Sequence, residues 1–136
     1  MILLDSNIVI DLIQDEGEWS EWSQSTLARL RLDRMMIVNA VVLAETADRF
    51  ASVATQMAYM RELGAVHRDI DASAAYRAGL AHRAYRRAGG TRAAILADFL
   101  IGGHSSILGA TLLTRDRQRF ASYFPELSLI TPETHP

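Results

Sequence analysis

Four carboxylic acids lie inside or next to apolar segments, where an acid in a folded protein usually has a partner. Asp5 directly follows the apolar run at the start of the chain, and Asp116 lies two residues beyond a similar run near its end. Glu45 and Asp98 each lie inside an apolar, helix-like segment. An isolated carboxylate in apolar surroundings is costly, and a shared divalent cation would remove that cost. The pattern therefore favours a site for Mg²⁺ or Mn²⁺, which prefer carboxylate oxygens.

A cation held in this way would have a defined chemical use. It lowers the pKa of a bound water molecule and neutralises the negative charge that builds up on a phosphate during hydrolysis. The reaction class that the acids indicate is therefore cleavage of a phosphodiester bond with water as the nucleophile.

Each acid also has a purely structural interpretation. Asp5 could cap the helix that follows it, and Asp116 could be an ordinary turn residue. Glu45 lies one helical turn before Arg49 and could pair with it. No arginine lies one turn to either side of Asp98, and the alternative there is a structural ion pair. The four acids together are more specific than any one of them.

Short apolar runs alternate with helix-like segments along the chain. The predicted strands are residues 1–4, 35–39, 65–67, 111–114 and 127–130. One predicted helix starts after Asp5, and another starts after the N-capping Asn39, with helical composition continuing up to residue 63. Three further helices are predicted at residues 18–32, 71–89 and 94–109. This alternation is typical of a three-layer α/β/α sandwich with a mostly parallel five-stranded sheet. Ligands bind beyond the carboxyl ends of such strands, where Asp5 and Asp116 are expected.

The composition is that of a single folded domain spanning residues 1–136. Apolar residues make up 49% and charged residues 22%, which argues against a disordered chain. The net charge of −2 means that nucleic acid could bind only at a local basic patch. The chain has no cysteine for disulfides or thiolate metal sites. Without a signal-peptide pattern or an apolar run of roughly 18 residues, we expect a cytoplasmic protein with no membrane partner.

Four segments that contain the acids resemble, in order, the four sequence motifs of PIN-domain nucleases. They read LLDSNIVIDL from residue 3, VNAVVLAE from residue 38, ILADFLIGGHS from residue 95 and LLTRDRQRF from residue 112. The resemblance spans nearly the whole chain. The size of the chain and the spacing of the motifs look most like the VapC-type toxins of bacterial toxin–antitoxin pairs.

The resemblance implies a PIN-like fold and a Mg²⁺- or Mn²⁺-dependent endoribonuclease. It implies catalytic, metal-binding roles for Asp5, Glu45, Asp98 and Asp116, with support from Asn7 and Thr114. It further implies an RNA substrate, a homodimer and a cognate antitoxin that covers the acids and alone contacts DNA. Two other functions stay open: a housekeeping RNA-processing nuclease without an antitoxin, and a mainly non-catalytic subunit of a DNA-bound repressor complex.

A local basic segment interrupts this acidic chain. No acid occurs from residue 72 to residue 97, and the segment contains Arg83, Arg86, Arg87 and Arg92. These arginines could bind RNA phosphates on the way to the acids. The alternative is a solvated helix face with cations near the helix C-terminus, where they are favourable.

Residues near the motifs carry further expectations. Gly102 lies one turn after Asp98 on the same helix face and is expected to leave space near the metal. His104 does not share that face and is expected in the core or at the surface. Trp19 and Trp22 could stack on bases, but three-residue spacing on an amphipathic helix favours packing.

Overall fold

A five-stranded sheet lies at the centre of the computed structural model, which describes residues 1–91 and 95–136. The strands run in the order β3-β2-β1-β4-β5, and every neighbouring pair is parallel. They are β1 (Ile2–Leu4), β2 (Met36–Val38), β3 (Ala65–His67), β4 (Thr111–Leu113) and β5 (Leu129–Ile130). Each lies within a predicted apolar run, so the expected sheet is confirmed, and it is parallel throughout.

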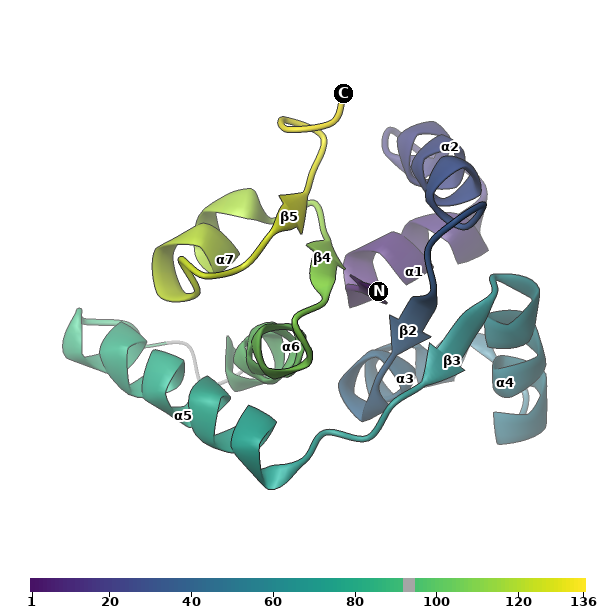
Figure 1. Ribbon diagram of the computed structural model, residues 1–136. Coiled ribbons are helices and arrows are strands. Elements are labelled where there is room, and N and C mark those ends of the chain that lie inside the picture. The colour runs from purple at the N-terminus through teal and green to yellow at the C-terminus, as the bar shows by residue number, and fades with distance from the viewer. Residues whose placement is uncertain (92–94) are drawn as a thin grey trace.

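Helices cover both faces of this sheet, which confirms the three-layer α/β/α sandwich. Figure 1 shows α1, α2 and α4 on one side and α5, α6 and α7 on the other. The helices are α1 (Ser6–Gln14), α2 (Ser20–Leu30), α3 (Ala40–Thr46), α4 (Val53–Glu62), α5 (Ala72–Arg87), α6 (Ile95–Leu108) and α7 (Arg117–Tyr123). The short helix α3 contacts both α1 and α6. Within the described ranges, no helix is long and apolar enough to cross a membrane.

The strands are short and apolar because helices bury them from both sides. Ile2, Leu3 and Leu4 of β1 have no exposed surface, and the same holds for Leu112 and Leu113 of β4. The strands are paired residue for residue, so they end at nearly the same level. The polar residue after each central strand is therefore placed at one edge of the sheet.

The helical segment predicted up to residue 63 is divided in the structure. The helix α3 tightens into a 3-10 turn at Ala47–Arg49, and α4 begins separately after Ser52. The Ser52 hydroxyl oxygen caps α4 by accepting a hydrogen bond from the Thr55 N–H at 3.1 Å. Residues 117–123, for which no helix was predicted, form α7. The expected start of another helix at residue 94 lies outside the described residues.

Two adjacent glycines let α6 pack closely against its neighbours. A Cβ at Gly103 would lie 2.6 Å from the Ala74 carbonyl oxygen of α5, so the two helices could not approach as they do. A Cβ at Gly102 would lie 2.5 Å from the Phe124 ring. The expectation that Gly102 leaves space near a metal is therefore wrong, because an aromatic side chain fills that space.

Candidate active site

Asp5 is the most buried of the four acids. It lies immediately after β1, caps α1 and is 4% exposed. Its Oδ1 accepts a hydrogen bond from the Ser6 N–H at 2.7 Å, and its Oδ2 accepts one from the Thr114 hydroxyl at 2.6 Å. Burial raises the pKa of Asp5 to about 6, the hydrogen bonds oppose that rise, and the negative charges of Asp98 and Glu45 add to it. Helix capping is therefore real, but it leaves a buried, electrostatically unfavourable carboxylate.

Glu45 is brought to Asp5 by the start of α3. The Asn39 side chain, directly after β2, caps this helix by accepting the N–H groups of Val41 and Val42 at 3.0 and 3.1 Å. One turn further along, Glu45 accepts a hydrogen bond from the Ser6 hydroxyl at 2.6 Å. Sequence reasoning identified Asn39 as the cap but missed the contact made by Ser6.

The pairing of Glu45 with Arg49, considered as a structural alternative, is absent among the described residues. Arg49 instead lies 3.4 Å from Asp48, its neighbour in the chain. The 3-10 turn that begins at Ala47 removes the helical spacing on which that pairing depended. Within residues 1–91 and 95–136, Glu45 is therefore held by a neutral hydroxyl and not by a cation.

Asp98 and Asp116 share a cation that sequence reasoning missed. The Arg119 Nη1 atom of α7 lies 2.6 Å from Asp98 Oδ2 and 3.1 Å from Asp116 Oδ2. The Asp98 side chain, expected to be buried, is 25% exposed. Burial raises the pKa of Asp98, Arg119 opposes that rise, and the charges of Glu45 and Asp116 add to it. The structural ion pair considered for Asp98 is therefore present.

Thr114 and Asn7, predicted as supporting residues, hold the loop after β4. The Thr114 hydroxyl donates to Asp5 and also accepts the Asp116 N–H at 3.0 Å. The Asn7 Oδ1 accepts the Arg115 N–H at 3.3 Å. These contacts tie the ends of two adjacent strands together, so the loop that carries Asp116 has a fixed position relative to Asp5.

A buried ion pair that the sequence did not suggest strengthens the same loop. The Asp11 carboxylate of α1 is 6% exposed and accepts hydrogen bonds from Arg115 Nε at 2.9 Å and Nη2 at 3.2 Å. It also accepts one from the Ser23 hydroxyl of α2 at 2.8 Å. Arg115 therefore has a structural role. The only sequence signal was an acid within the apolar run of the first motif.

These contacts bring together the four acids from separate parts of the chain. We call Asp5, Glu45, Asp98 and Asp116 the acid site. Ser6 links the first two acids, Thr114 links the first to the last, and Arg119 links the last two. They lie where the strand ends meet α3, α6 and the start of α7.

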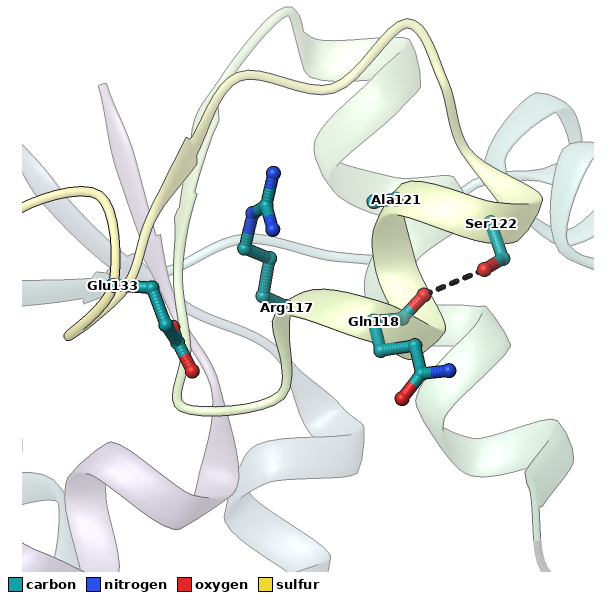
Figure 2. A pocket seen from close by; sticks show the side chains of 5 residues that line it. All are labelled: Arg117, Gln118, Ala121, Ser122 and Glu133. Atoms are coloured by element: carbon teal, nitrogen blue, oxygen red, sulfur yellow. Dashed lines mark hydrogen bonds between the residues drawn. The ribbon is translucent and has the colours of Figure 1, made fainter.

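The acid site opens to shallow hollows around the start of α7. One hollow of about 340 Å³ is lined in part by Asp116, Arg119 and Tyr85. Another of about 380 Å³ is lined in part by Asp116 and Asn7. Figure 2 shows a neighbouring hollow of about 450 Å³ between α7 and the C-terminal segment, lined by Arg117, Gln118, Ala121, Ser122 and Glu133. Asp116 is thus reachable from two of these hollows.

The arginines of α5 divide into a structural and an exposed group. Arg77 forms a two-bond ion pair with Glu126 at 2.8 and 2.9 Å, so its role is structural. Arg83, Arg86 and Arg87 are exposed and line a hollow of about 580 Å³. Arg92, also predicted to bind RNA, lies outside the described residues.

The tryptophans and His104 have structural contacts. Trp22 packs against the core and donates its indole N–H to the His135 carbonyl at 2.8 Å. Trp19 lies with its ring 5.8 Å from the Arg115 guanidinium carbon. His104 was expected in the core or at the surface, and it is buried in the core. Its Nδ1 lies 3.1 Å from the Asn39 Nδ2. These contacts favour packing over base stacking.

The donor chemistry of the acid site fits a hard divalent ion. All four groups are carboxylates, which suit Mg²⁺ and Mn²⁺. A guanidinium already acts as a cation between Asp98 and Asp116. In the described part of the chain, however, no three acidic or histidine side chains stand ready as a ligand cage.

Comparison with known proteins identifies the fold. Neither a protein-family model nor a curated protein sequence matches the chain. Among solved structures, it resembles VapBC2 from Rickettsia felis bound to a promoter DNA fragment, at 20% identity and TM-score 0.73, covering 96% of this chain and 98% of that chain. It resembles VapBC-1 from nontypeable Haemophilus influenzae at 17% identity and TM-score 0.72, with coverage of 96% and 98%. FitAcB from Neisseria gonorrhoeae matches at 20% identity and TM-score 0.69, covering 98% and 99%.

The protein therefore has a PIN-domain fold. More particularly, its architecture over nearly the whole chain is that of VapC-type toxin chains in VapBC complexes. At 17–20% identity this likeness establishes the fold. It agrees with the resemblance of the four sequence motifs.

Proposed function

We propose that this protein is a metal-dependent endoribonuclease and the toxin of a toxin–antitoxin pair. The observation that carries the proposal is the convergence of four carboxylates near the strand ends, with buried Asp5 held, among the described residues, only by neutral donors. Such a carboxylate is costly unless a cation binds there. The likeness to chains of VapBC and FitAB complexes supports the nuclease class and an antitoxin partner.

The chain's own residues would prepare this site for RNA hydrolysis. Asp5, Glu45 and Asp98, with Asp116 beside them, would hold Mg²⁺ or Mn²⁺. The bound ion would supply a water of lowered pKa and neutralise charge on the phosphate. Thr114 orients Asp5 through its hydroxyl hydrogen bond, which limits the rearrangement needed to present the carboxylate.

The partners follow from the proposed class. The substrate would be RNA, approaching over the exposed arginines of α5, and the protein would form a homodimer. A cognate antitoxin would cover the acid site and supply all DNA contacts. VapBC from Salmonella typhimurium and FitAB were both solved bound to DNA, which supports a DNA-contacting partner.

Metal binding gives the first test. Millimolar Mg²⁺ or Mn²⁺ should raise the melting temperature of EDTA-treated protein, because an ion that binds only the folded state stabilises it by mass action. At an ion concentration of 100 times Kd the gain is about 2.7 kcal/mol, or roughly 10 °C. Scanning fluorimetry measures this, with NaCl at equal ionic strength as control. Identical melting curves would contradict a shared metal site.

The same preparation tests the nuclease activity. Total RNA should be cut when Mg²⁺ or Mn²⁺ is present and left intact in EDTA, and sequencing of the new RNA ends would define the cleavage site. Addition of purified candidate antitoxin should stop the cleavage. Protein that binds the ion but cuts no RNA under any of these conditions would overturn the proposed activity.

The exposed arginines provide a separate prediction about RNA binding. Changing Arg83, Arg86 and Arg87 together to Gln should weaken RNA binding, because three phosphate contacts are lost. The slope of log affinity against log salt concentration should fall by about two, at about 0.7 per phosphate on a single strand. Fluorescence anisotropy with labelled RNA at several salt concentrations measures the slope.

A triple change elsewhere on the surface provides the matched control. Arg29, Arg31 and Arg61 are also exposed and lie on α2 or directly after it and on α4, in the opposite helical layer. Their replacement by Gln removes the same charge, so it should leave the salt slope near that of the wild type. Equal slopes for both triple variants would show that the exposed arginines of α5 do not bind RNA phosphates.

A further inference from the structure

Arg119 stands inside the acid site as a built-in cation. Its Nη1 lies 2.6 Å from Asp98 Oδ2 on α6 and 3.1 Å from Asp116 Oδ2 at the start of its own helix. The Arg119 N–H also donates to Asp116 Oδ1 at 3.2 Å, which caps α7. Both the backbone and the guanidinium of Arg119 are therefore fixed against the acids, and its side chain is only 27% exposed.

The four acids consequently differ in how their charge is balanced. Asp98 and Asp116 share the guanidinium, whereas Asp5 and Glu45 accept hydrogen bonds from neutral groups of Ser6 and Thr114. Across residues 1–91 and 95–136, no arginine or histidine forms an ion pair with Asp5 or Glu45. The acid site thus has a neutralised half and a half with unbalanced negative charge.

We propose that the acid site takes one divalent ion, bound by Asp5, Glu45 and Asp98, and that Arg119 occupies the position of a second ion between Asp98 and Asp116. This inference rests on the proposed metal-dependent function. A second ion there would have to break two short ion pairs and would be repelled by the guanidinium at a few ångströms. Arginine keeps its charge at every working pH, so this position is filled whatever the metal concentration.

The same contact assigns separate tasks to the two oxygens of Asp98. Arg119 takes Oδ2, and Oδ1 would remain to bind the ion together with Asp5 and Glu45. Arg119 is therefore a positioning residue that orients Asp98 toward one ion. Asp116 is held by Arg119 and Thr114, which keeps it beside the ion.

Counting bound ions tests the inference. Metal-free protein is titrated with Mn²⁺, and free Mn²⁺ is measured by electron paramagnetic resonance. The wild type should bind one ion per chain, and Arg119→Gln should bind two because Asp98 and Asp116 then lack a cation. Arg119→Lys should again bind one, since a single ammonium can contact both acids. Two ions in the wild type, or an unchanged count in Arg119→Gln, would overturn the inference.

A neighbouring arginine gives the matched control. Arg117 is exposed on the same helix and forms no ion pair among the described residues, so Arg117→Gln removes one charge and should still bind one ion. Without metal, Arg119→Gln should melt a few degrees below Arg117→Gln, because two acids then lie together unbalanced. Equal melting temperatures would contradict the structural half of the inference.

The outcomes also separate this inference from the proposed function. One ion in the wild type and two in Arg119→Gln, with no RNA cleavage by either, would support the place of Arg119 and overturn the nuclease. RNA cleavage by a wild type that binds two ions would support the nuclease and overturn the proposed place of Arg119. If neither protein binds Mn²⁺, both proposals fall.

Discussion

The Asp98→Asn variant is expected to cut RNA roughly 10³-fold more slowly than the wild type, or worse. Asparagine has nearly the same shape as aspartate but carries no charge, so the ion would lose one of the carboxylates that hold it. The activated water and the charge neutralisation would be lost together. Cleavage rates at saturating Mn²⁺, measured on the RNA identified by end sequencing, test this. A variant that cuts at the wild-type rate would remove Asp98 from the mechanism.

The same variant should fold almost as stably as the wild type. The Asp98 side chain is 25% exposed, and pairs of this kind contribute about 1 kcal/mol or less. Arg119 would keep Asp116 as its partner at 3.1 Å, so no buried cation is left alone. The loss of repulsion between Asp98 and Glu45 acts in the opposite direction. We therefore expect metal-free melting temperatures within a few degrees of each other.

An exposed acid in the 3-10 turn Ala47–Arg49 provides the control. The Asp48 side chain is 80% exposed and pairs with its neighbour Arg49, so Asp48→Asn should alter neither cleavage nor melting. A loss of roughly 3–5 kcal/mol in Asp98→Asn, the range for breaking a buried pair, would instead mean that Asp98 is mainly structural.

Local patterns accounted for most of the fold and for the polar residues at the ends of the three central strands. Each strand is a short apolar run, and Asp5, Asn39 and Thr114 directly follow β1, β2 and β4. In a parallel sheet such residues meet at one edge, so their proximity follows from sequence order alone. Asn39 also caps α3 as predicted, because capping depends only on the next three residues.

The missed contacts depend on tertiary structure or on a local change of geometry. Arg119 is 21 positions from Asp98, and no periodic signal connects them. The helix α7 that presents Arg119 is short and polar, with Phe120 as its one buried residue, so its sequence has no apolar period that predicts a helix. The pairing of Glu45 with Arg49 failed because the helix tightens to a 3-10 turn between them. These contacts are the ones that determine the charge balance of the acid site.

Gly102 shows why a shared helix face is weaker evidence than a contact. The residue does lie one turn from Asp98 in the same helix. The space beside it is occupied by Phe124, which follows α7 and packs against Phe99. The sequence near the glycine contains no information about an aromatic residue more than twenty positions away, so its purpose could be found only from the packing.

Metal-free wild-type protein is expected to lose stability relative to Asp5→Asn as the pH rises from 4 to 7. Burial raises the pKa of Asp5 from its ordinary value of 3.8 to about 6 in the folded protein. A carboxyl group with a raised folded pKa binds protons more tightly when folded, so its contribution is present below pH 4 and is lost as the pH rises through 6. The difference between the two pKa values corresponds to roughly 3 kcal/mol.

The comparison with Asp5→Asn isolates this contribution, because asparagine does not titrate and all other groups remain. The groups that face Asp5 are Glu45 on α3, Asp98 on α6 and the neutral donors of Ser6 and Thr114. Urea denaturation of both proteins between pH 4 and pH 8 in EDTA gives the two stability curves. The two free energies of unfolding should diverge by up to roughly 3 kcal/mol above pH 6. A weaker hydrogen bond between Thr114 and the asparagine would reduce this difference. Saturating Mn²⁺ should reduce the divergence, since a bound cation favours the ionised carboxylate that burial disfavours. Parallel curves in EDTA would mean that Asp5 ionises without cost and that the acid site has no unbalanced charge to attract an ion.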